Sequence, residues 1–121
     1  MKKAVLLVLL AMSLPAAAAD CVYPRAPGRM PDGNTASREE MVAAKKQVDE
    51  YIVSMNTYLD CIKAEHDTAM ADTAAPLTDE QKKQITVRFV QKNDAAVDEQ
   101  QDVASRFNEQ RHIFLDKTKK K

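Results

Sequence analysis

Glycine and proline are confined to a small part of this chain, and their distribution constrains its fold more than any other feature. Both glycines and four of the five prolines lie before residue 34, and the remaining proline is Pro76. Proline ends or kinks a helix, and glycine weakens one. Residues 37–75 and 77–121 lack both, so the sequence predicts two long helices separated by a break at Pro76.

The first nineteen residues have the pattern of a secretory signal peptide. Lys2 and Lys3 precede an apolar run over residues 4–14, and alanines at 17–19 fit the small-residue pattern of a cleavage site. The run has about half of the roughly 20 residues that a transmembrane helix needs. We therefore expect cleavage after residue 19, a periplasmic location and no membrane anchoring once the signal is removed.

The composition of the remaining chain excludes several classes of protein. Removing Lys2 and Lys3 from 18 basic residues leaves 16 against 18 acidic ones, a net charge of −2 that argues against a nucleic-acid partner. The glycines, Gly28 and Gly33, lie in a proline-rich stretch and not where a strand meets a helix. Rossmann and P-loop enzymes need glycine at that junction, so these classes are excluded.

Each predicted helix starts with a capping box, in which a serine or threonine is followed three residues later by glutamate or glutamine. Ser37 precedes Glu40, and Thr78 precedes Gln81. The stretch before Ser37 contains three prolines and should be extended. The predicted boundaries are a signal peptide over 1–19, an extended segment over 20–36, and a helical domain over 37–121 with helices at about 37–71 and 78–117.

Apolar residues recur three and four positions apart along both predicted helices, which is the pattern of a buried stripe. The short break between the helices favours an all-α, coiled-coil-like antiparallel two-helix hairpin. A turn centred on residues 74 and 75 places Met55 near Ala96 and Val48 near Val103. The predicted seam, defined as the residues that face the other helix, comprises Met41, Val48, Ile52, Met55, Leu59, Ile62, Ile85, Phe89, Ala96, Val103 and Phe107.

The two cysteines, Cys21 and Cys61, predict a structural disulfide in an oxidising compartment. Between Ser37 and Cys61 a helix rises about 36 Å at 1.5 Å per residue. The 16 residues from Cys21 to Ser37 cover that distance at about 2.3 Å each, below the 3.1 Å of polyproline II. The segment should therefore run antiparallel along the first helix and bond to it at Cys61.

Several apolar residues fall outside the seam. Val87, Val90 and Val97 define a candidate interaction face, which could be covered by a second copy in a homodimer or by the N-terminal segment. In the second case the disulfide would bring Val22 and Tyr23 near residues 87–90. We also expect Tyr51 and Tyr58 to pack in the core with their hydroxyl groups at the solvent edge.

The candidate chemical groups do not converge. His66 and His112 lie about 40 Å apart along the predicted hairpin axis, too far to share a metal ion. The cysteines are forty positions apart and lack the C-x-x-C spacing of redox enzymes. The sequence therefore predicts no catalytic residues, no metal and no cofactor.

Two resemblances to known proteins can be drawn from these residues. The elements Cys21-x-x-Pro24, Pro31-Asp32-Gly33, Glu40-Met41, Tyr51 and Tyr58-Leu59-x-Cys61 resemble a family of small secreted proteins of Gram-negative bacteria, which implies a periplasmic location and a disulfide. Residues 77–81, Leu-Thr-Asp-Glu-Gln, are similar to the L-T-x-x-Q motif of periplasmic stress chaperones related to Spy. That likeness implies a holdase whose dimer cradles unfolded clients.

These observations leave two functional hypotheses. The first is a non-enzymatic periplasmic interaction or structural module that presents a helical face to an unknown protein partner. The alternative is a periplasmic holdase-type chaperone. The two differ in whether the protein suppresses the aggregation of several unrelated unfolded proteins.

Overall fold

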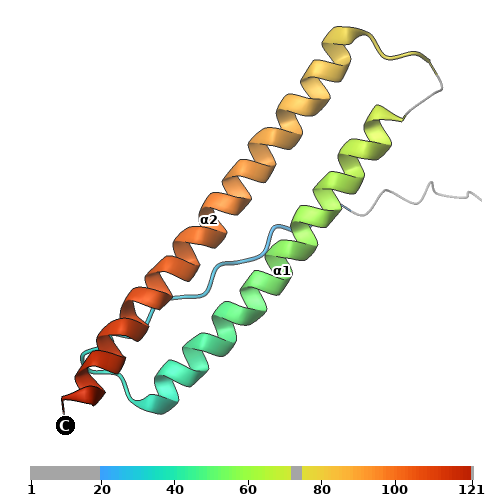
Figure 1. Ribbon diagram of the computed structural model, residues 1–121. Helices are drawn as coiled ribbons and strands as arrows, with labels where there is room; N and C mark the ends of the chain where they lie inside the picture. The colour runs from blue at the N-terminus through green and yellow to red at the C-terminus, as the bar shows by residue number, and fades with distance from the viewer. Residues whose placement is uncertain (1–19, 72–74, 121) are drawn as a thin grey trace, which may run out of the picture.

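The computed structural model describes residues 20–71 and 75–120, and the predicted signal peptide lies outside them. Its elements are helix α1, Arg38–Met70, and helix α2, Asp79–Lys119. The two helices pack antiparallel along one another (Figure 1). The prediction of an all-α hairpin with an extended, disulfide-bonded N-terminal segment is therefore confirmed.

Both helices begin with capping boxes. The Ser37 hydroxyl accepts a hydrogen bond from the Glu40 amide, and the Glu40 carboxylate accepts one from the Ser37 amide. Thr78 and Gln81 form the same reciprocal pair at the start of α2. Each box satisfies two backbone donors that would otherwise lack a partner in the first turn, so the local sequence fixes both helix starts.

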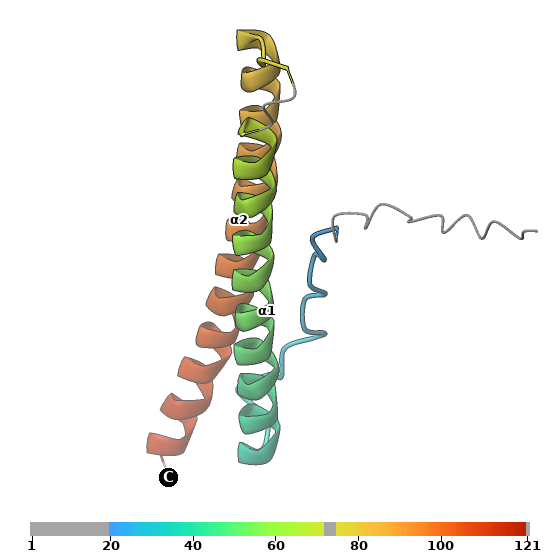
Figure 2. The same cartoon turned by 90° about the vertical axis from the view of Figure 1, so that its right-hand side faces the viewer.

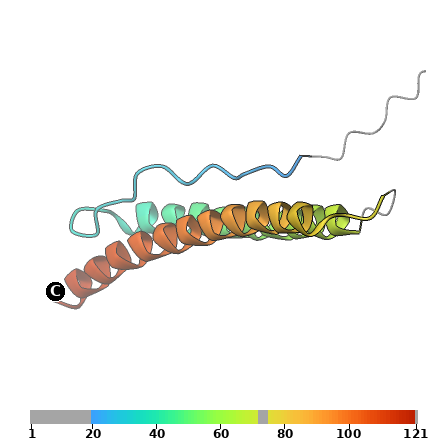
Figure 3. The same ribbon diagram turned by 90° about the horizontal axis from the view of Figure 1, so that it is seen from above.

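Residues 20–36 form an extended segment, here called the strap, which lies on one face of the two-helix layer (Figure 3). The strap starts beside the C-terminal half of α1, at the Cys21–Cys61 disulfide, and runs toward the C-terminal end of α2 (Figure 1). The opposite face of the layer, here called the open face, carries no other described part of the chain.

The core is a single row of apolar side chains between the helices. Met55, Ala96 and Val103 are completely buried, and among the described residues no charged side chain is buried. Ala36 of the strap also belongs to this core, and Met30 packs against it. Because so few large side chains are buried, the hairpin depends strongly on each of them.

The register of the helices differs from the turn-centred prediction. The Gln100 amide donates to Asn56 Oδ1 at 2.9 Å and to the Ile52 carbonyl at 3.4 Å. A turn centred on residues 74 and 75 would place residue 94 level with Asn56, six positions earlier. The first turn of α2 extends past the end of α1 (Figure 1), so the connection is asymmetric and its length does not set the register.

Gly33 lies where the strap backbone touches α2. Its amide donates to Gln110 Oε1 at 2.9 Å. A Cβ atom at this position would lie 2.9 Å from both Ile113 Cβ and the Phe114 amide nitrogen, and would collide with the Gln110 carbonyl oxygen. Only glycine allows this close approach, because the opposing atoms belong mainly to helix backbone and cannot move aside.

Gly33→Ala is therefore expected to detach this end of the strap, at a cost of about 3 kcal/mol or more, the upper end of the range for overpacking. The matched control is Gly28→Ala, because a Cβ atom at Gly28 meets nothing within 4 Å. Limited proteolysis should cut the strap of the Gly33 variant faster while the far-ultraviolet circular dichroism stays unchanged. Equal proteolysis of the two variants would contradict this contact.

Candidate functional site

The strap is attached to both helices. The Cys21 and Cys61 Cα atoms are 5.6 Å apart across the disulfide, which confirms the predicted pairing. Next to it, the Tyr23 ring packs edge-on against the Tyr58 ring, with centroids 4.9 Å apart. The Tyr23 hydroxyl donates to a Glu99 carboxylate oxygen on α2. The strap thus bonds covalently to α1 and by a charge-assisted hydrogen bond to α2.

These contacts correct two expectations. Tyr23 meets Tyr58 and Glu99, and not residues 87–90, because the observed register brings Gln100, instead of residue 94, beside Asn56 and so places Glu99 near Tyr58. The hydroxyl of Tyr51 does not reach solvent: it is buried and has no hydrogen-bond partner among residues 20–71 and 75–120. Burial, with the nearby Glu99 carboxylate as the next cause, raises the pKa of Tyr51.

The strap contact should make the protein sensitive to alkali. Burial, and then the hydrogen bond to Glu99, raise the pKa of Tyr23 above the tyrosine value of about 10. The folded state therefore holds this proton more tightly than the unfolded state, and the resulting stability is lost as the pH rises above about 10. Tyr23→Phe removes the bond, so the melting temperature of the parent should exceed that of the variant near pH 8 and approach it near pH 11. A constant difference across this range would contradict the assignment.

The structure places the predicted seam residues at different depths. Met41, Val48, Met55 and Ile62 of α1 are buried, as are Ala96, Val103 and Phe107 of α2. The partly buried seam residues that pack against this core are Ile52, Leu59 and Phe89. Ile85 is half-buried near the turn.

The candidate interaction face remains largely uncovered. Val87 and Val90 are each 44% exposed, and Val97 is half-buried. Valine is a poorer helix former than alanine, lysine or glutamine on an exposed helix surface. Helix propensity therefore does not explain why valine occurs at these positions. Val87 and Val90 stay partly exposed in the described part of the chain.

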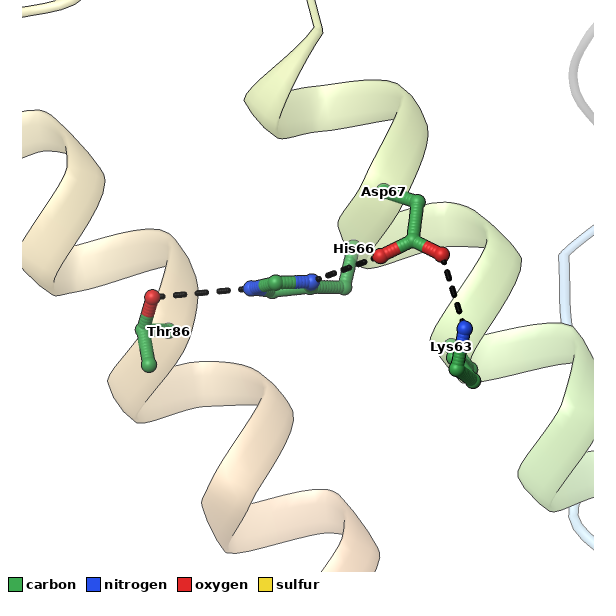
Figure 4. Close-up of polar contacts among 4 residues, drawn as sticks. All are labelled: Lys63, His66, Asp67 and Thr86. Carbon is green, nitrogen blue, oxygen red and sulfur yellow. Dashed lines mark hydrogen bonds and ion pairs between the residues drawn. The ribbon is translucent and has the colours of Figure 1, made fainter.

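His66 links the two helices near the turn (Figure 4). Its Nδ1 lies 3.2 Å from Asp67 Oδ1, its Nε2 lies 3.5 Å from the Thr86 hydroxyl, and its ring stacks at a tilt on Phe89. Hydrogen bonds from Lys63 and then His66 lower the pKa of Asp67. The imidazole is thus held by packing and polar contacts at the edge of the helix interface.

A shallow hollow of about 150 Å³ lies beside His66 between the helices. Its apolar floor includes Ile62 and Phe89, and the Glu65–Lys92 ion pair crosses its rim at 2.9 Å. The bond to Glu65 raises the pKa of Lys92. This ion pair neutralises Glu65 and Lys92, and Arg88 in the lining leaves the hollow with about one positive charge.

A second hollow lies at the other end of the hairpin, where α1 begins and α2 ends. It is about 170 Å³ in volume and is here called the end groove. Its apolar lining includes Val42, which is 61% exposed, and Leu115, which is 37% exposed. The complete lining is Arg38, Met41, Val42, Lys45, Phe107, Arg111, Phe114 and Leu115.

The end groove is not among the sites predicted from the sequence. Met41 and Phe107 belong to the predicted seam, whereas Arg38, Arg111 and Leu115 belong to no predicted site. The signal available in the sequence was the cluster Arg111-His112-Ile113-Phe114-Leu115, in which three apolar residues lie beyond Phe107, the last predicted seam position. The helix register determines which of these side chains share a surface with α1. The predicted register differs from the observed one, so this surface could not be identified from the sequence.

No group of three or more His, Cys, Asp or Glu side chains in residues 20–71 and 75–120 is arranged to hold a metal ion. Within the same part of the chain, neither helix has an apolar stretch long enough to cross a bilayer.

The fold and its surfaces define a helical hairpin braced by a disulfide-bonded strap, with apolar side chains left exposed on both helices. Comparison of the chain with protein-family models, curated proteins and solved structures found no match. Any functional assignment therefore depends on the surfaces of this structure.

Proposed function

We propose that the protein is a non-enzymatic periplasmic interaction module whose helices bind a protein partner. The observation that carries the proposal is the exposure of Val42, Val87, Val90 and Leu115 after the strap and both helices have packed. Exposed apolar side chains that lie together are characteristic of interaction sites, and here they form two groups: Val42 with Leu115 in the end groove, and Val87 with Val90 near the turn. The disulfide supports an oxidising compartment, since such bonds are rare in the cytosol.

The arrangement of side chains supports binding better than catalysis. His66 is engaged by Asp67, Thr86 and Phe89 near the turn. His112 is exposed and lies 23 residues, or about 35 Å, further along α2 than Phe89, the residue on which the His66 ring stacks. A nucleophile, a base and an orienting acid must lie within hydrogen-bonding distance of each other to act together.

The capping box offers a local explanation for the L-T-x-x-Q likeness to the Spy-related chaperones. The Thr78 hydroxyl and the Gln81 side chain are both engaged in the box at the start of α2. The holdase alternative is tested separately from selective binding, by the suppression of aggregation of several unrelated unfolded proteins.

The test is affinity capture from a periplasmic extract with the oxidised chain as bait. A selective module should retain the same partner repeatedly and lose it when Val90 or Leu115 is replaced by aspartate. Val53→Asp is the matched control, because Val53 is also exposed but lies beside the strap residues Val22 and Pro24 and lines neither the end groove nor the hollow near the turn. Suppression of aggregation of several unrelated proteins at comparable ratios would instead favour the holdase. If neither Val90→Asp nor Leu115→Asp reduces the retention of the partner, the proposal is contradicted.

A further inference from the structure

We infer that the end groove binds an amphipathic helix of a partner protein, with leucine-like side chains on the helix face that enters the groove and acidic residues along its flanks. The inference rests on the proposed function and assigns the site and the chemistry of the partner. Three observations support it: the place of the groove on the open face, its apolar floor of limited length, and its uniformly cationic rim.

The groove lies on the face opposite the strap. Gln110 contacts the strap, and Leu115 is five positions further on, or about 140° around the helix at 100° per residue. Tyr58 also contacts the strap, and Lys45 is thirteen positions earlier, again about 140° away. Both groove residues therefore face away from the strap. The C-terminal end of α2 also diverges from α1 on that side (Figure 2), which opens the groove.

The dimensions of the groove match a short helix. Its lining comes from the first turns of α1, between Arg38 and Lys45, and from the last turns of α2, between Phe107 and Leu115. From Phe107 to Leu115, α2 rises about 12 Å, the length of about two helical turns. Val42 and Leu115 border the hollow, and Met41 and Phe107 lie buried beneath them. An apolar stripe with a spacing of three and four residues would fill such a groove.

The charges of the groove specify acidic flanks. Arg38, Lys45 and Arg111 line it, and no acidic side chain does. Within the part of the chain that the structure describes, Lys45 pairs with Asp49 at 2.6 Å, whereas Arg38 and Arg111 form no ion pair. Two free guanidinium groups beside an apolar floor complement carboxylates that flank a leucine stripe. A concave hollow accepts the side chains of a helix better than the flat surface of a bilayer, so we assign the groove to a helix.

The experiment uses the full oxidised chain and two synthetic helical peptides of about 16 residues, a length of roughly four turns. Both peptides carry leucines at positions i, i+4, i+7 and i+11, and their flanks are glutamate in one and lysine in the other. The chain has no tryptophan, so a single tryptophan in each peptide reports binding by fluorescence. The glutamate peptide should bind at least tenfold more tightly than the lysine peptide. Arg111→Glu should reduce this preference severalfold, because Arg38 and Lys45 remain in the lining, and Leu115→Asp should weaken both peptides.

Lys82→Glu is the matched control, because it makes the same kind of charge change at the opposite end of α2 and should leave the preference intact. Equal binding of the two peptides, or an Arg111→Glu variant with the parental preference, would overturn the inference. Binding of phosphatidylglycerol vesicles without binding of either peptide would also overturn the inference, because it would assign the groove to a membrane surface. A dimer that Leu115→Asp dissociates would assign it to a second copy. If Arg111→Glu still captures the partner from the extract as the parent does, the groove assignment fails while the proposed function stands.

Discussion

Met55→Asp is expected to unfold the hairpin at room temperature. Met55 is completely buried in the middle of the helix interface, and the core contains no charged side chain that could pair with an introduced carboxylate. An unpaired buried charge costs several kcal/mol, a large part of the 5–15 kcal/mol that stabilises a typical domain. Isolated helices are marginal in water, so most of the helical circular dichroism should disappear with the tertiary packing.

The matched control for this prediction is Val53→Asp. It introduces the same charge two residues earlier, at a side chain that is 65% exposed. This variant should melt within a few degrees of the parent, since surface substitutions usually change stability by less than about 0.5 kcal/mol. If Met55→Asp also melts like the parent, the assignment of the helix interface is wrong.

Cys61→Ser is expected to produce the second large loss of stability. The disulfide joins residues forty positions apart, and in the chain-entropy model a loop of that size contributes about 4 kcal/mol. For a domain of this size, the loss corresponds to a fall in melting temperature of about 15 °C or more. The helical signal at low temperature should be retained, because the core between α1 and α2 does not include the sulfur atoms.

Two controls separate the disulfide from other effects of this substitution. Cys21→Ser should lower the melting temperature by the same amount, and the double variant should be no less stable than either single one. A dithiol reductant should bring the parent to the same value and leave the variants unchanged. A parent melting curve that is insensitive to reductant would show that the bridge does not stabilise the fold.

The main features of the fold could be predicted because each has a local or an arithmetic cause. The capping boxes at Ser37 and Thr78 use residues within a single turn, so a short stretch of sequence specifies them. The disulfide was predicted from two cysteines in an oxidising compartment, and the comparison of the rise of a helix with the reach of an extended segment predicted the path of the strap. The buried stripe of α1 recurs regularly enough to identify the side that faces α2.

The features that could not be predicted depend on the relative placement of distant segments. The pairing of Gln100 with Asn56 depends on how two apolar surfaces fit together, and loop length does not determine it. The contacts of Tyr23 with Tyr58 and Glu99 depend in turn on the path of the strap across that interface. The end groove combines side chains from both ends of the helical domain, so it becomes visible only when the register is known.

The antiparallel hairpin itself is tested most directly by a distance measurement between spin labels at Lys45 and Asn108, attached to the oxidised protein. Both residues are exposed and lie at the same end of the hairpin. Packed helices have axes about 8–10 Å apart, so the labels should be within about 25 Å of each other. Two helices joined end to end would separate these residues by about 95 Å at 1.5 Å per residue. A distance near that value would contradict the fold and every surface derived from it.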